Sequence, residues 1–200
     1  NQLVVEFNEP LDPVNTADAA EFLSIDGNTN EIVLIDRYDA NEYWLELGFS
    51  NEGTGVYQLV ISDVSDCWGN TVDVEICTGF SLEAQENEVV INEVLFDPET
   101  GGSDYVELLN ISDRVTGLEK WRVASLNSGQ INTEVIFTES NYTLCPGEYI
   151  VLTDNPLAQR DQYPNAQMNR MLTVDNLPGF PNEDAGVMLF DSLEVMDWMY

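Results

Sequence analysis

The chain has 200 residues, enough for one large domain or two small ones, and 44% of them are hydrophobic, which argues against an intrinsically disordered protein. Its 37 acidic residues outnumber 6 basic ones, and the formal charge of −31 disfavours direct binding to nucleic acids or to anionic membranes. The sequence contains no histidine, which excludes Ser-His-Asp and Cys-His catalytic systems. Catalysis would have to rest on carboxylates, Lys120, tyrosine or cysteine, and we expect no catalytic residue and no enzyme activity. The acidity favours divalent cations and basic partners, or simply keeps the protein soluble in saline surroundings.

The first 80 residues show short runs of alternating apolar and polar residues separated by turn residues, which is typical of antiparallel strands. In the last run, Val72, Val74 and Ile76 face one way and polar residues the other, which predicts a half-buried sheet. Between the first two strands, residues 16–22 fit one short helical turn. The predicted strands cover residues 3–7, 31–35, 42–49, 56–62 and 71–80.

Three segments of this half carry a family resemblance: NQLVVEFNEPLDP, ADAAEFLSIDG and VYQLVISDVSDCWGN. Together they resemble the opening and closing motifs of bacterial immunoglobulin-like (Ig-like) repeats. The resemblance covers residues 1–80 and implies a β-sandwich of a secreted protein. It begins late in the repeat, so we expect the repeat's first strand to be missing.

Residues 81–88, SLEAQENE, are polar and acidic and lack a β pattern. We therefore predict a linker there, with relative motion of two domains on either side of it. The second domain then covers residues 89–200.

The second domain opens with VVINEVLFDPETGGSDYVELLN, which predicts a strand, an acidic loop with two glycines and a second strand. A predicted strand over residues 118–123 and the segment LCPGEYIVLTDN follow. In this order the motifs resemble the lamin-tail domain, an Ig-like β-sandwich. The resemblance implies that Trp121 and Tyr149 lie inside the sandwich and that the final strand is clipped. We therefore predict an all-β chain of two tandem immunoglobulin-like β-sandwiches.

The segment NPLAQRDQYP predicts one short helix. Asn155 is placed to cap it, Pro156 suits its first position, and the helix should end before Pro164.

The three cysteines, Cys67, Cys77 and Cys145, fit no zinc-binding spacing. Cys67 lies in a predicted turn and Cys77 along the next strand, and a straight strand would separate them by roughly 20 Å, beyond the reach of a disulfide. A bridge between these two therefore needs an irregular strand. Three alternatives stay open: a Cys67–Cys77 bridge, a Cys77–Cys145 bridge, or free thiols.

The acidic loop of the second domain is the candidate metal site. Asp97, Glu99 and Asp104 surround two glycines, and calcium takes about six to eight such oxygen ligands. The spacing does not match an EF-hand, and the alternative is a solvated loop whose glycines serve the turn. Calcium is the one cofactor that we consider; the sequence suggests no other.

Two tryptophans and a pair of glutamates are further candidate site residues. Trp44 alternates out of phase with its apolar neighbours and Trp68 lies on a predicted turn, so we expect both to make exposed contacts. Glu93 and Glu107 lie on adjacent predicted strands. A pair of carboxylates is what a glycosidase needs, but we expect a structural role as hydrogen-bond acceptors.

Both resemblances imply a non-enzymatic structural or adhesion module of a secreted or surface-displayed bacterial protein. The expected partner is a protein or glycan surface of unknown identity, with no nucleic acid and no membrane insertion. The 200 residues would be a monomeric fragment of a larger extracellular chain. The alternative is an accessory targeting or spacer region of a secreted hydrolase or nuclease whose catalytic domain lies outside this fragment.

Overall fold

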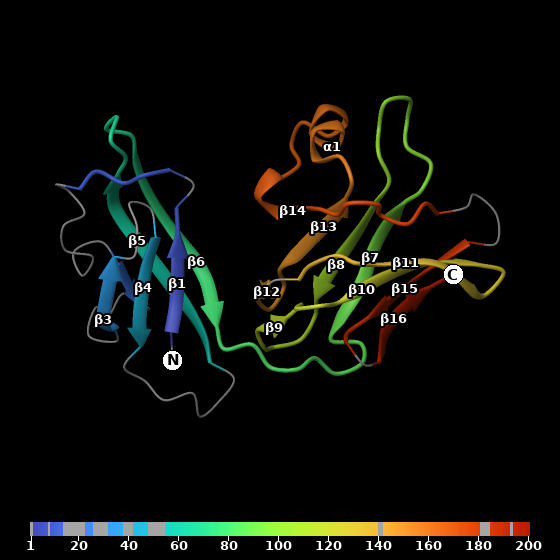
Figure 1. The fold of residues 1–200 in the computed structure, drawn as a ribbon, viewed down its shortest axis with the longest axis horizontal. Coiled ribbons are helices and arrows are strands. Elements are labelled where there is room, and N and C mark those ends of the chain that lie inside the picture. Colours follow the sequence, from blue (N-terminus) through green and yellow to red (C-terminus); the bar gives the residue numbers. More distant parts are fainter. Residues whose placement is uncertain are drawn as a thin grey trace. The chain divides into compact units, whose positions relative to one another are not determined.

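The computed structural model divides the chain into two compact units, Asn1–Phe80 and Ser81–Tyr200 (Figure 1). Among the residues that it describes, no helix is long and apolar enough to cross a membrane. The described residues are 2–7, 9–13, 23–25, 32–37, 42–47, 55–139, 142–180, 185–192 and 194–200.

The described strands of the first unit form two antiparallel three-stranded sheets. One sheet has the order β1-β4-β3, with strands Gln2–Glu6, Glu42–Leu47 and Ile32–Arg37. The other has the order β2-β5-β6, with strands Leu23–Ile25, Val56–Ser65 and Thr71–Gly79. Every strand predicted for this half is present with shifted ends, β2 is additional, and the helical turn predicted at 16–22 lies outside the described residues.

The prediction that β6 has one buried face is wrong. Val72, Val74 and Ile76 are 43%, 36% and 44% exposed. The reason is that β6 is the edge strand of its sheet and that β5 supplies the core beside it, through Leu59 and Ile61. The alternation of apolar residues therefore predicts the strand correctly here, but it does not predict that one face of the strand is buried.

Asp66 organises the turn between β5 and β6. Its carboxylate accepts hydrogen bonds from the backbone N–H groups of Trp68 and Asn70, both at 2.8 Å, and from the Asn70 side chain at 2.5 Å. These bonds, that of the Asn70 side chain above all, hold the pKa of Asp66 below its usual value. The turn leaves Trp68 on the outside, 76% exposed.

The second unit is built on two four-stranded sheets. The first has the order β14-β13-β8-β7, with strands Met171–Thr173, Tyr149–Thr153, Tyr105–Asn110 and Val89–Leu95. The second has the order β11-β10-β15-β16, with strands Gln130–Ile136, Arg122–Asn127, Ala185–Phe190 and Val195–Met199. A short ladder joins β9 (Thr116–Gly117) to β12 (Thr143–Leu144). Only β13 and β14 run parallel among the strand pairs described here; the others are antiparallel.

One hydrophobic core fills the space between these two sheets. Its members come from alternate positions of both sheets, so the strands present one apolar face inward. The side chains with the least exposure include Val106, Leu108, Leu118, Val123, Leu144, Ile150, Leu152 and Leu189. At about 25 cal/mol per Å² of buried apolar area, this cluster supplies the main stabilisation of the unit.

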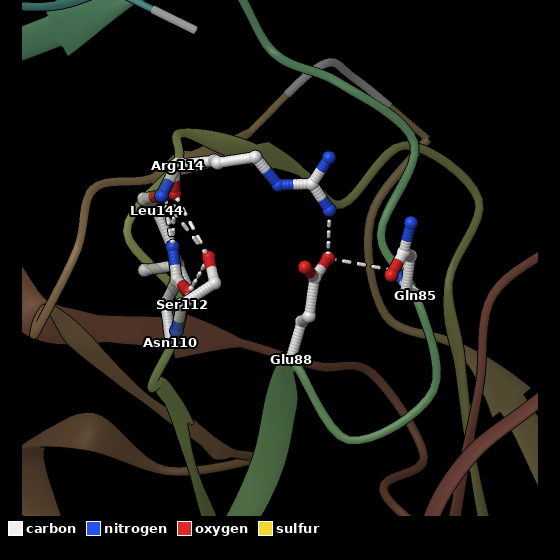
Figure 2. A network of polar contacts seen from close by, with 6 residues as sticks. All are labelled: Gln85, Glu88, Asn110, Ser112, Arg114 and Leu144. Atoms are coloured by element: carbon white, nitrogen blue, oxygen red, sulfur yellow. Dashed lines mark hydrogen bonds and ion pairs between the residues drawn. The ribbon is translucent and has the colours of Figure 1, made fainter.

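Asn110, the last residue of β8, is buried at the centre of a network of polar contacts (Figure 2). Its side-chain amide donates to the carbonyls of Arg114 at 2.8 Å and Leu144 at 2.9 Å. Its Oδ1 accepts from the Ser112 N–H at 2.9 Å and from the Ser112 hydroxyl at 2.7 Å. Beside it, Arg114 forms an ion pair with Glu88, directly before β7. A buried amide with every polar atom paired fixes the loop after β8.

The helix α1 (Pro156–Gln162) confirms the prediction made from its capping residues. The Asn155 side chain accepts a hydrogen bond from the Ala158 N–H at 3.1 Å, and Pro156 occupies the first turn. A short 3-10 helix, η3 (Met168–Arg170), follows and leads into β14. Figure 1 shows α1 directly after β13.

Two sequence predictions for this unit are corrected by backbone hydrogen bonding. The strand expected over 118–123 is interrupted by a turn, because Lys120 has φ 60° and the Trp121 N–H donates to Leu118 O at 3.2 Å. The segment 81–88, expected to be a linker, is bound to the second unit: Leu82 bridges Thr116, and the Asn87 N–H donates to Met196 O at 2.9 Å. A polar segment without alternation can still pair its backbone groups with a neighbouring sheet.

Candidate functional site

The first sheet of the second unit has two different faces. In β8, Val106 and Leu108 point into the core and are fully buried, whereas Tyr105 and Glu107 lie half-buried on the opposite face. Successive side chains of a strand point to opposite sides, so the core-facing positions leave the alternate ones for the outer face. The outer face is therefore the polar one.

Strand β13 repeats this arrangement beside β8. Ile150 and Leu152 are buried in the core, and Tyr149 and Val151 lie half-buried on the outer face, with Val151 paired to Glu107 of β8. The prediction that Tyr149 lies inside the sandwich is therefore wrong. Its two neighbours along the strand are spaced to fill the core, which leaves Tyr149 outside.

Helix α1 and the segment that follows it turn back over this outer face and enclose a cleft of about 180 Å³. From the sheet, Tyr105, Glu107 and Tyr149 line it; from the covering segment, Gln159 and Tyr163 do so. The rings of Tyr105 and Tyr163 meet edge to face, with centroids 6.5 Å apart and planes at 88°. The cleft thus has aromatic walls on both the sheet and the helix.

Gln159 is the most deeply buried of these polar residues, at 2% exposure. Its Nε2 donates to the carbonyl oxygen of Ser103, which can only accept, so the orientation of the amide is fixed. The Ser103 hydroxyl is itself bonded to Asp154 and lies 3.2 Å from the Thr153 hydroxyl. Among the described side chains, Gln159 Oε1 is the one buried polar atom without a hydrogen-bond partner.

Two carboxylates meet at the edge of the cleft. Glu93 of β7 pairs directly across the sheet with Glu107 of β8. Each accepts one hydrogen bond from a side chain: Glu107 from the Asn92 amide at 2.6 Å, and Glu93 from the Tyr105 hydroxyl at 2.5 Å. Both glutamates therefore accept hydrogen bonds, as expected, and the donors are side chains.

No ion pair among the described residues neutralises the charge of this carboxylate pair. In the ion pairs found among the described residues, the partners are other acids, and neither Glu93 nor Glu107 takes part. Burial first, and then the hydrogen bond to Glu93 and its charge, raise the pKa of the Tyr105 hydroxyl, which therefore stays a donor. Two like charges directly opposite in a sheet repel each other.

Residues 83–200 match the family described as the Lamin Tail Domain. The chain belongs to this family. The lamin tail domain is an Ig-like β-sandwich, in agreement with the two packed sheets of the second unit. The chain as a whole is mostly β, with the short helix α1.

No curated protein matches the chain. Among the solved structures that do match is a DUF4876 family protein from Bacteroides thetaiotaomicron, with 13% sequence identity and a TM-score of 0.38 over 96% of this chain and 67% of that one.

The calcium candidates lie in the loop between β7 and β8 of the lamin tail domain. Asp104 lines a second hollow, of about 480 Å³, together with Asp154 and Gly102, whereas Asp97 and Glu99 lie on the exposed side of the loop. Burial, and then the charges of Asp154 and Asp97, raise the pKa of Asp104, against a hydrogen bond from Phe180. No three acidic or cysteine side chains in the described part of the chain form a group that could hold a metal ion.

The predictions made for the tryptophans have different outcomes. Trp68 is exposed as predicted, the side chain of Trp44 lies outside the described residues, and Trp121 is buried in the lamin-tail core as predicted, at 3% exposure. Trp68 belongs to the first unit, whereas the elements that build the tyrosine-lined cleft belong to the second.

The cysteine alternatives are resolved in the structure. Cys77 and Cys145 are disulfide-bonded, and Cys67 is a free, exposed thiol. The Cys67–Cys77 bridge is therefore wrong, as the distance along a strand suggested.

Sequence reasoning missed the cleft because its parts come from separate segments. Tyr105 and Tyr149 were assigned to strands, but no pattern in the sequence around Tyr163 predicts that its side chain packs over the sheet beside them. The usable signal was the alternation in β8, which places Glu107 on the same face as Tyr105. The burial of Gln159 could not be predicted from the sequence, because a glutamine in a short helix is ordinarily exposed.

Proposed function

We propose that the chain is a non-catalytic binding module with which a secreted or surface-displayed bacterial protein attaches to a partner. The observation that carries the proposal is the cleft of about 180 Å³ on the outer face of the lamin tail domain, which is lined by three tyrosines, a glutamate and a glutamine. Aromatic walls with a few convergent polar groups are typical of binding sites.

The extracellular part of the proposal is supported by the cysteines. Cys77 and Cys145 are disulfide-bonded, and disulfides persist mainly in oxidising compartments. The charge of −31 suits a protein that remains soluble outside the cell.

We also propose that the first unit is a second Ig-like sandwich, of the bacterial repeat type, which extends the module as a spacer. Its two antiparallel three-stranded sheets and the Asp66 turn support this. An experimental structure of the whole chain tests it: β1-β4-β3 should face β2-β5-β6 across a common apolar core. Two sheets that do not pack face to face would contradict it.

Cys67 provides a test of the location. It is free and exposed, so a membrane-impermeant maleimide added to intact cells that make the protein should label it. The Cys67→Ser variant is the control and should give no label. Labelling that requires cell lysis would contradict an extracellular role.

The binding role is tested by retention. Beads that carry the chain should be retained on surfaces coated with basic proteins or with glycans. The retention should be saturable, and free chain in solution should compete with it. Absence of saturable retention on every such surface would contradict a binding module.

A further inference from the structure

We propose that the tyrosine-lined cleft of the lamin tail domain binds a single cationic side chain, the ammonium of lysine or the guanidinium of arginine, presented by a basic partner. This deepens the proposed binding function and rests on it. The occupant follows from the size of the cleft, its walls and its uncompensated charge.

The size of the cleft selects a small occupant. Its volume is about 180 Å³, whereas sites for drug-sized ligands and cofactors span about 300–1,000 Å³. A single extended side chain is therefore the scale of ligand that this open cleft accommodates.

The walls suit a cation with an aliphatic stem. The rings of Tyr105 and Tyr163 stand edge to face and Tyr149 lines the same space, so the stem can pack on rings and the charge can approach a ring face. Ammonium and guanidinium groups are attracted to tyrosine faces within about 6 Å. Met171 adds a flexible apolar contact at one side.

The polar groups of the cleft need a donor. Gln159 Oε1 is a buried acceptor without a partner, and leaving such an atom unpaired is costly. Glu107 has one carboxylate oxygen bonded to Asn92 and faces the like charge of Glu93 across the sheet. A ligand with several N–H donors and a positive charge complements the Glu107 carboxylate.

No basic residue of the described chain fills this role. Arg170, which directly precedes the cleft residue Met171, lies close enough to Tyr149 for the two to interact electrostatically, but its ion pair is with Glu148 at 2.7 Å. The other described ion pairs also leave Glu107 and Glu93 without a partner. Since no ion pair among the described residues neutralises Glu107, the proposed cation is one that a partner supplies. A neutral sugar could stack on the tyrosines, but it would leave the two carboxylates facing each other without a counter-charge.

The test is an NMR titration of the 200-residue chain with the methylamides of acetyl-lysine and acetyl-arginine, in about 1 M salt. The Debye length is then about 3 Å, so general attraction to the acidic surface is suppressed. We expect saturable shifts at the amides of Tyr105, Glu107, Tyr149, Gln159 and Tyr163. The methylamide of acetyl-norleucine, which has a similar stem but no charge, should give no such shifts.

Matched variants locate the site. Glu107→Gln should weaken lysine binding about tenfold, as expected for the loss of a charged hydrogen-bond partner. Tyr163→Ala should weaken it about two- to fivefold through lost ring contact, and Tyr163→Phe should retain it. Glu86→Gln makes the same change of charge at an exposed glutamate outside the cleft and should change affinity less than about twofold.

Three results would overturn the proposal: norleucine shifts as large as those of lysine, N-acetylglucosamine that binds more tightly than lysine and is insensitive to Glu107→Gln, or no shifts in the cleft with either cation. Each is independent of whether Cys67 is labelled on intact cells, so failure of the cleft and failure of the extracellular role are distinguishable.

Discussion

The two faces of the sheet β14-β13-β8-β7 are made by the same strands but differ in the burial and polarity of their side chains. The inner face carries Leu108 and Ile150, which are completely buried in the sandwich core. The outer face carries Glu107 and Tyr149, one position along the same strands, half-buried under α1. If the outer face binds a partner as proposed, stability and recognition depend on adjacent positions of one strand, and substitutions at these positions should affect one property and spare the other.

The largest expected effect is on the inner face. Leu108→Ala should lower the free energy of unfolding by about 2–5 kcal/mol, because it removes a fully buried side chain and leaves a cavity. Leu109→Ala, its half-buried neighbour on the outer face, should cost less than half as much. Chemical denaturation of both variants measures the difference. Equal losses would break the distinction between the two faces.

A smaller loss is expected at the polar end of the inner face. Asn110→Ala removes the donors to the carbonyls of Arg114 and Leu144 and should cost about 2 kcal/mol, because buried polar groups are left unpaired. Asn110→Asp keeps the acceptor and loses the donors, so it should also destabilise. Asn127→Ala, at an exposed asparagine, is the control and should be nearly neutral in the same denaturation experiment.

The outer face should respond with the opposite sign. Glu107→Gln removes one of two like charges paired across β7 and β8, so the free energy of unfolding should rise by about 0.2–1 kcal/mol at low salt. The gain should shrink as salt screens the repulsion. A variant that is destabilised in thermal unfolding at low salt would mean that Glu107 holds the fold together, contrary to a binding role.

The smallest effect concerns pH. Burial and the carboxylates of Asp154 and Asp97 raise the pKa of Asp104 above its unfolded value, so Asp104 favours folding when protonated and loses this contribution as the pH rises through its folded pKa. Asp104→Asn should therefore be more stable relative to the parent at pH 7 than at pH 4. Denaturation at the two pH values, with Glu86→Gln as the exposed control, checks the sign. A constant difference would contradict it.

Local chemistry made much of the fold predictable from the sequence. Asn155 and Pro156 carry a helix-start signal that depends on a few adjacent residues, and α1 begins there. The second strand predicted within the motif VVINEVLFDPETGGSDYVELLN, which followed from the lamin-tail resemblance, is β8, and both the motif and the strand end at Asn110. The buried Trp121 followed from the lamin-tail resemblance.

The errors arise where tertiary structure overrides the local pattern. In β7 the register shifts between Ile91 and Glu93, so strict alternation assigns the wrong face beyond that point, and Val94 packs against the core. The Ile91 N–H donates at 2.7 Å to Asp197 of β16, a residue 106 positions away. The candidate site was missed for the same reason, since the return of Gln159 and Tyr163 over the sheet is decided by packing and not by spacing.

The most direct test of the account is a crystal structure of the chain with acetyl-lysine methylamide bound. We predict the ammonium within hydrogen-bond distance of Glu107, with the aliphatic stem against the rings of Tyr105 and Tyr163. A ligand held elsewhere on the acidic surface, with the cleft still filled by water, would contradict it.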